Sequence, residues 1–139
     1  MASKREQVLA TLFDRLRAVP GTAVKRNQAL PQSVPAGGLI ILRDGDPGEP
    51  DVTLNPRTEY YTHRAEIEAF AGDETGIDAL FVAVAAALAG DRSLGGLAEN
   101  LYLGAPEIGA LAIDGAAPIA TGRATLIIEY LAGDPLASD

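Results

Sequence analysis

The segment Thr58–Ala71 constrains the fold of this chain more than any other part of the sequence. From Tyr60 to Ala69, the odd positions carry aromatic or aliphatic side chains and the single histidine, and the even positions carry mostly polar or charged side chains. This period of two is typical of a β-strand that packs against a core on one face and meets solvent on the other. We therefore expect a long strand here, with one apolar face and one charged face.

The size and composition favour a single domain that spans residues 1–139. A chain of this length with 47% hydrophobic residues can bury one core, so we expect one sheet and a few helices. No apolar run approaches the length needed to cross a bilayer, and the first 13 residues carry charges where a signal peptide would be apolar. We expect a soluble, intracellular protein. The absence of cysteine excludes disulfides, thiolate catalysis and zinc sites that use sulfur.

The net charge of −8 is unevenly distributed along the chain. The first 30 residues hold six basic and two acidic side chains, a net charge of +4, and the other 109 hold five basic and 17 acidic side chains, a net charge of −12. Acidic surfaces repel nucleic acid, because its binding depends on counterion release by Lys and Arg. Tight nucleic acid binding is therefore not expected. The basic end can meet an acidic surface on another protein or on another copy of this chain.

Two segments carry the helical period. The first begins at a capping-box pattern, Ser3 followed by Glu6, and its apolar residues recur at helical spacing until Pro20 and Gly21. The second follows Asp73, a suitable N-cap, and ends near Gly90; its alanines favour a helix that approaches a sheet closely. The apolar positions of the two helices are Val8, Leu9, Leu12, Phe13 and Leu16 in the first, and Ile77, Leu80, Phe81, Val84, Ala87 and Leu88 in the second.

The remaining segments indicate further strands and two irregular regions. Residues 39–42 form a short apolar run typical of a central strand, 101–103 indicate a short strand, and 119–131 alternate like a second long strand. Residues 22–30 are only weakly strand-like. The Gly- and Pro-rich segment 43–51 is expected to protrude as an extended hairpin, and the segment Gly104–Pro118 shows no regular pattern. The order of elements indicates an α+β fold.

Few residues suggest chemistry, and each has a structural interpretation that we favour. His63, the only histidine, lies on the apolar face of its strand and has no partner at triad or metal-ligand spacing, so a hydrogen-bonded structural histidine is expected. The loop from Asp44 to Asp51 gathers four carboxylates, a group that hard cations favour, but Pro47 and Pro50 disagree with an EF-hand pattern. We expect a solvated loop and no resident metal.

The glycine pairs and the glutamates of the long strands are also open to a functional interpretation. Gly37-Gly38 and Gly95-Gly96 lie outside both the dinucleotide and the P-loop patterns, so tight turns are expected and a bound nucleotide or other cofactor is not. Glu66, Glu68 and Glu129 can be paired as acid and base, but neighbouring strands commonly present carboxylates to solvent. None of these groups points to an enzyme.

Four segments together resemble a known family. They are REQVLATLFDRLRAV from Arg5, GGLIILRDGD from Gly37, HRAEIEAFAGD from His63 and DRSLGGLAEN from Asp91, the last being the most specific. In this order they resemble the tail terminator and minor tail proteins of long-tailed bacteriophages and prophages. The resemblance spans nearly the whole chain, apart from residues 30–35 and 104–118. It implies a mixed, mostly antiparallel sheet with two main helices packed on one face.

The resemblance also implies a structural, non-enzymatic role. Such proteins form a ring, usually of six copies, that caps the tail tube, stops its polymerisation and joins it to the head. The expected partners are other copies of the chain, the tail tube protein and a head-completion or connector protein, and the expected location is the virion tail, reached from the host bacterial cytoplasm. Because unlike surfaces meet in a head-to-tail ring, we take as candidate interface residues the basic Arg5, Arg15 and Arg17 and the acidic Glu66 and Glu68.

Two other classes remain open. A head–tail joining (neck) protein or another minor tail protein would share these patterns without ending the tube. A small cation- or ligand-binding module would instead bind calcium saturably at residues 44–51. An enzyme would lose activity when His63 or a glutamate pair is changed.

Overall fold

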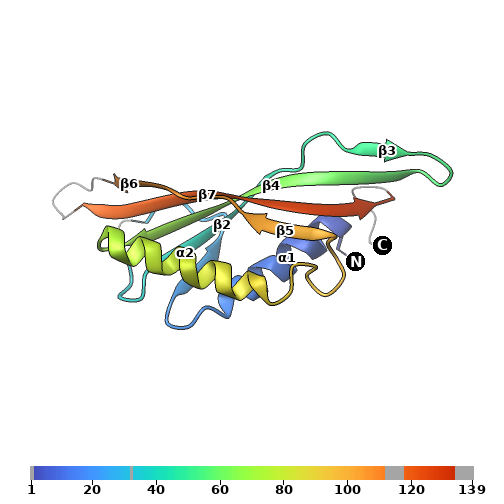
Figure 1. Ribbon diagram of the computed structural model, residues 1–139. Helices are drawn as coiled ribbons and strands as arrows, with labels where there is room; N and C mark the ends of the chain where they lie inside the picture. The colour runs from blue at the N-terminus through green and yellow to red at the C-terminus, as the bar shows by residue number, and fades with distance from the viewer. Residues whose placement is uncertain (1, 32, 112–117, 134–139) are drawn as a thin grey trace.

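A long β-sheet carries both helices on one of its faces and leaves much of the other face open (Figure 1). This computed structural model describes residues 2–31, 33–111 and 118–133. The helices are α1 (Lys4–Arg17) and α2 (Glu74–Ala89). The strands are β1 (Ala23–Arg26), β2 (Leu39–Asp46), β3 (Asp51–Thr53), β4 (Thr58–Ala71), β5 (Asn100–Leu103), β6 (Glu107–Leu111) and β7 (Ile119–Ala132).

The sheet is built around the two 14-residue strands β4 and β7, which pair antiparallel from Glu59↔Ala132 to Ala71↔Ala120. Within the described residues, the strand order is β1-β2-β4-β7-β5, with β3 also on β4 and β6 also on β7. Only β1 and β2 run parallel. The structure thus confirms the expected α+β fold, with a mixed, mostly antiparallel sheet and two helices on one face.

The alternation of β4 determines which side chains face the helices. Its odd positions, from Glu59 to Ala71, are buried beneath or beside the helices, and its even positions from Tyr60 to Glu68 lie on the opposite side, which we call the open face. The same alternation in β7 buries Ala124, Leu126, Ile128 and Tyr130. One apolar cluster joins these residues to both helices, because each helix has apolar positions along a single stripe.

Helix α1 begins as the sequence predicts, with Ser3 as N-cap and its side chain accepting a hydrogen bond from the Glu6 amide at 3.1 Å. The Glu6 carboxylate, expected to complete the capping box, instead accepts two hydrogen bonds from Arg26 at 2.7 and 2.8 Å. A charged guanidinium from β1 is a stronger partner than a backbone amide. The helix ends at Arg17, close to the predicted stop.

Helix α2 lies very close to β7. Its N-cap is Asp73, whose carboxylate accepts from the Gly76 amide at 2.7 Å, and Gly90 is its C-cap. Gly122 of β7 faces Ile77 and Phe81; a Cβ atom there would lie 2.7 and 2.6 Å from carbons of these side chains. The small residue is therefore what permits this approach.

A second, smaller cluster covers one end of the open face. It contains Leu39, Ile41, Phe70 and Ile119, with Val34 from the loop after β1 and Leu111 of β6 packed against it. Phe70 is thus an even-numbered β4 residue that is buried, in contrast to the charged residues before it. The open face is apolar at this end and charged further along.

Two sequence expectations need correction. The segment Gly104–Pro118, expected to be irregular, contains β6, which pairs with the first half of β7; backbone hydrogen bonds form this edge strand without an alternating pattern. The segment 43–51 does not protrude: β2 continues to Asp46, and β3 then pairs with β4 further along the same edge. The hairpin that projects, at the right of Figure 1, is β3–β4 with its turn at residues 54–57.

Candidate functional site

His63 is fully buried, and both of its ring nitrogens have partners. Nδ1 lies 3.0 Å from the Tyr130 hydroxyl, and Nε2 lies 2.5 Å from the backbone oxygen of Asp44. Because a backbone oxygen can only accept, Nε2 donates, and the neutral ring accepts at Nδ1 from the tyrosine. Burial lowers the pKa of His63, and the hydrogen bond to Asp44 offsets this only in part. The ring joins β4 to β7 and to β2, as expected of a structural histidine.

The polar contact continues from His63 toward the projecting hairpin. The ring of Tyr130 stacks on Tyr61 with 5.4 Å between centroids, and the Tyr61 hydroxyl donates to Glu59 at 2.7 Å. Burial raises the pKa of Tyr130 to about 12, so its hydroxyl stays protonated and able to donate. Arg57 pairs with the same glutamate at 2.9 Å. The arrangement carries hydrogen bonds through the core face where the helices no longer cover it.

A second polar cluster joins α1, β1 and β2. Arg26 donates to Asp44 at 2.8 and 3.0 Å as well as to Glu6, and Arg5 lies 3.7 Å from Asp44. The hydrogen bond from Arg26 lowers the pKa of Glu6. Burial acts to raise the pKa of Asp44, but its contacts with Arg26 outweigh this, and the pKa is lowered. These charges hold the first helix to the sheet edge.

The four carboxylates between Asp44 and Asp51 do not converge. Asp44 is engaged by Arg26, the Asp46 carboxylate accepts from the Gly48 amide at 2.9 Å, and Asp51 lies in β3 with its side chain exposed. Among the residues that the structure describes, no group of three or more acidic or histidine side chains could hold a metal ion. The geometry of this loop therefore does not favour a calcium site.

The turn after α2 is organised by Asp91. Its carboxylate accepts from the Ser93 hydroxyl at 2.7 Å, the Ser93 amide at 3.1 Å, the Gly95 amide at 2.8 Å and Arg15 at 3.2 Å. The hydrogen bond from the Ser93 hydroxyl, followed by those from the two amides, lowers the pKa of Asp91 to about 2. The Gly96 amide donates to the Ser93 backbone oxygen. These amides are already used within the turn, which argues against a phosphate cradle.

The basic residues proposed for the interface differ in how they are used. Arg15 pairs with Asp91 and Arg5 with Asp44, so both contribute to contacts inside the chain. Arg17 is the most exposed of the three; it lies 3.7 Å from Asp14 and over the Phe13 ring. The sequence asymmetry of charge is thus partly neutralised within the fold.

The acidic members, Glu66 and Glu68, lie on the open face of β4, away from α1. Glu66 is 3.7 Å from Arg123, and Glu68 pairs with Arg43. Near the hairpin the Tyr60 hydroxyl donates to Glu129 of β7. Both signs of charge are therefore interleaved across this face.

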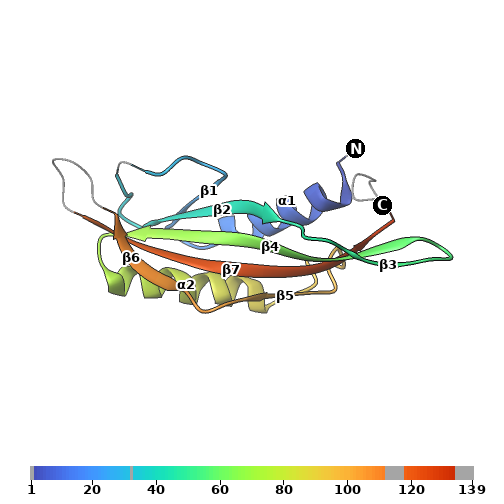
Figure 2. The same ribbon diagram turned by 90° about the horizontal axis from the view of Figure 1, so that it is seen from above.

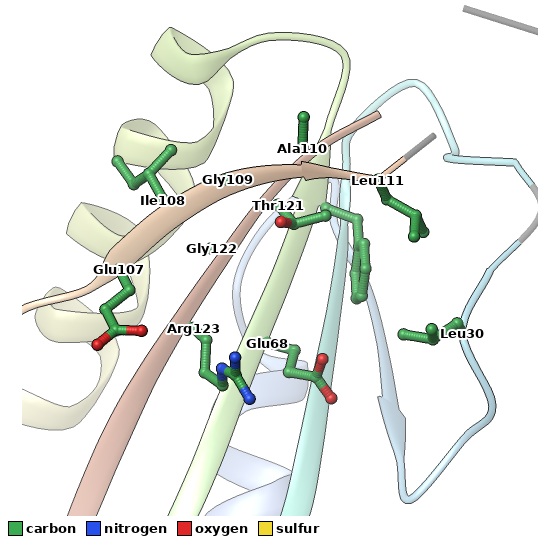
Figure 3. A pocket seen from close by; sticks show the side chains of 11 residues that line it. Leu30, Glu68, Glu107, Ile108, Gly109, Ala110, Leu111, Thr121, Gly122 and Arg123 are labelled. Atoms are coloured by element: carbon green, nitrogen blue, oxygen red, sulfur yellow. The ribbon is translucent and has the colours of Figure 1, made fainter. Parts of the chain in front are cut away.

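Sequence reasoning missed a pocket of about 280 Å³ at the far end of the open face (Figure 3). Phe70 and Thr121 line it, with Leu30 and Leu111 to one side and Glu68, Glu107 and Arg123 to the other. It forms where β6 and the loop after β1 meet β4 and β7. The only signal in the sequence was Leu30 itself, an apolar residue in a segment of turn-forming residues.

No protein-family model matches this sequence, and no curated protein matches it. In the described part of the chain, neither helix is long and apolar enough to cross a membrane.

Proposed function

We propose that this protein is a structural component of a long-tailed phage or prophage tail, a terminator that forms a ring on the tail tube and joins it to the head. The proposal rests first on the resemblance of the four sequence segments described above. The α+β fold with both helices on one sheet face fits it. Such a protein would act in the virion tail after assembly in the host bacterial cytoplasm.

One structural observation carries the proposal furthest: the polar groups that suggest chemistry are used to hold the fold together. His63 is hydrogen-bonded to Tyr130 and to the Asp44 backbone, and Asp91 organises the turn after α2. The exposed features are instead an open sheet face and a projecting hairpin. Broad surfaces of this kind suit contacts with other proteins.

The charge of the chain agrees with a role around passing DNA. The net charge is −8, and the open face alternates acidic and basic side chains such as Glu66 and Arg123. A surface without a basic surplus gains little from counterion release. DNA could pass such a surface without being held.

The decisive experiment adds the protein to polymerising tail tube protein and measures tube lengths by electron microscopy. We expect shorter tubes that carry a ring at one end. Tubes of unrestricted length would contradict the terminator function. A neck or other minor tail protein would bind tubes or heads without shortening the tubes, so the same images separate these alternatives.

Charge reversal tests whether α1 takes part in the ring. Arg17→Glu is the informative change, because Arg17 is exposed and its ion pair with Asp14 contributes little to folding. Arg15→Glu would also break the contact with Asp91, so it serves as a comparison only if thermal unfolding shows that it stays folded. An Arg17→Glu variant that limits tube length normally would exclude α1 from the interface without affecting the terminator function.

A further inference from the structure

Two exposed apolar surfaces lie at opposite ends of β4. One is the hairpin tip, residues 52–57, where Val52 and Leu54 are exposed, Leu54 to 72%. The other is the groove, our name for the pocket lined by Leu30, Phe70 and Leu111, where Leu30 is 56% exposed. Exposed leucines on a soluble protein are ordinary when scattered, but two that occur at matching ends of a long strand invite a common explanation.

The groove has the size and the chemistry to receive an apolar side chain beside a cation. Cavities of about 150 Å³ can hold a benzene ring, so a groove of about 280 Å³ has room for a leucine side chain. Figure 3 shows Leu30 and Leu111 across the groove from the Glu107 carboxylate. Among the described residues, Glu107 has no ion pair within 4 Å. It is therefore available to a basic partner.

The hairpin tip has the complementary chemistry. Leu54 points into solvent, and Arg57, three residues later, has a side chain 61% exposed although it also contacts Glu59. Residues 52–58 include no acidic side chain, in a chain whose net charge is −8. Three residue pairs between β3 and β4, from Asp51↔Tyr60 to Thr53↔Thr58, hold the tip in an extended form.

The tip of one molecule cannot reach its own groove. Thr58 begins β4 at the tip, and Phe70 lines the groove 12 residues later. At about 3.3 Å per residue, the two ends of the strand are roughly 40 Å apart. A contact between them must join two copies, and because the two surfaces differ, it is head-to-tail and can close into a ring.

We propose that the hairpin tip of each copy docks into the groove of the next, with Leu54 beside Leu30 and Leu111, and Arg57 beside Glu107. This inference rests on the proposed function for the ring on the tube, and it assigns that ring's contact to these two surfaces instead of to α1. The partner is therefore a second copy of this chain.

Mixing two variants tests the contact. Leu54→Asp damages only the tip and Leu30→Asp only the groove; Val82→Asp, at an exposed α2 residue (61%), is the matched control. We measure mass by sedimentation equilibrium up to about 1 mM chain, where contacts with millimolar dissociation constants are populated. The unmodified chain and the control should associate. Each damaged variant alone should associate at least about tenfold more weakly, and their equimolar mixture should form dimers but nothing larger.

Several outcomes would overturn the proposal. They are a monomeric unmodified chain at every concentration, damaged variants that associate normally, a mixture that stays monomeric, or an equal loss in the Val82→Asp control. A charge exchange adds a second criterion: Arg57→Glu and Glu107→Arg should each weaken association, and the two changes in one chain should restore it. Asp78→Arg, at an exposed α2 position, controls for the change in net charge.

The tube assay distinguishes this inference from the proposed function. If the unmodified protein shortens tubes and Leu54→Asp does so equally well, the tip–groove contact is wrong and the terminator function stands. If the unmodified protein associates through tip and groove but leaves tube length unrestricted, the contact stands and the terminator function is wrong.

Discussion

Replacement of Gly122 by alanine should destabilise the protein by forcing α2 away from the sheet. An added Cβ atom would lie 2.6 Å from Phe81 Cε2 and 2.7 Å from Ile77 Cγ2, whereas ordinary contacts begin at 3.4 Å. These side chains would have to retreat by roughly 0.7–0.8 Å. Both are buried, Ile77 completely, and packed interiors do not yield that distance freely.

The expected cost follows from two opposing effects. Overpacking a core typically costs about 1–3 kcal/mol. Replacing glycine by alanine also removes freedom from the unfolded chain, which stabilises by about 0.4–1 kcal/mol where the backbone tolerates it; the backbone of Gly122 is not in the left-handed region. The net loss should be about 1–2 kcal/mol, equivalent to a fall in Tm of roughly 3–8 °C for a chain of this size.

Urea and thermal unfolding followed by circular dichroism measure this loss. Gly72→Ala is the matched control, because a Cβ atom there meets nothing within 4 Å and the residue has no left-handed φ; its stability should stay equal or rise slightly. If Gly122→Ala is as stable as the control, the close approach of α2 to β7 does not constrain the packing, and the reasoning fails.

Three further predictions concern the polar contacts. The free energy of unfolding should fall as pH drops below about 6.5, because His63 has a lowered pKa in the folded state, with a slope of up to about 1.4 kcal/mol per pH unit; His63→Gln should remove this slope between pH 6.5 and 5, and an unchanged slope would exclude the only histidine as its source. Asp91→Ala should lower Tm by releasing Arg15 and the turn amides, and stability supported by this carboxylate should be lost as pH falls from about 4 toward 2; a Tm equal to the unmodified chain's would contradict this. Asp44→Asn should cost about 1–2 kcal/mol through its contacts with Arg26, Asp51→Asn should cost little, and calcium should not shift the Tm of the unmodified chain; a calcium-dependent rise lost in either variant would support a cation site.

Periodicity in the sequence was enough to predict the helices and the long strands. The alternation in β4 correctly separated its buried face from its charged face, and the spacing in α2 correctly identified Ile77, Leu80, Phe81, Val84 and Leu88 as core residues. These predictions succeed because a side chain's direction depends on its position within its own element. Asp73 and Ser3 were likewise recognisable as N-caps, since capping is a contact between near neighbours in the chain.

Contacts between distant residues could not be predicted from the sequence. The partner of Arg15 is 76 residues away, that of His63 is 67 residues away, and the Glu6 carboxylate pairs with Arg26 instead of closing its capping box. Charge asymmetry alone made the basic helix look available to another copy, but several of these charges are neutralised inside the fold.

The sequence by itself determined the elements, their buried faces and the α+β class of the fold, because these follow from local hydrophobic spacing. Only the tertiary structure decided that β6 forms an edge strand, that the β3–β4 hairpin projects, and that Leu30 meets Phe70 and Leu111 in a groove. Edge pairing uses backbone groups that every residue carries, and a groove depends on which elements meet across the sheet. Neither property leaves a pattern that a single segment can show.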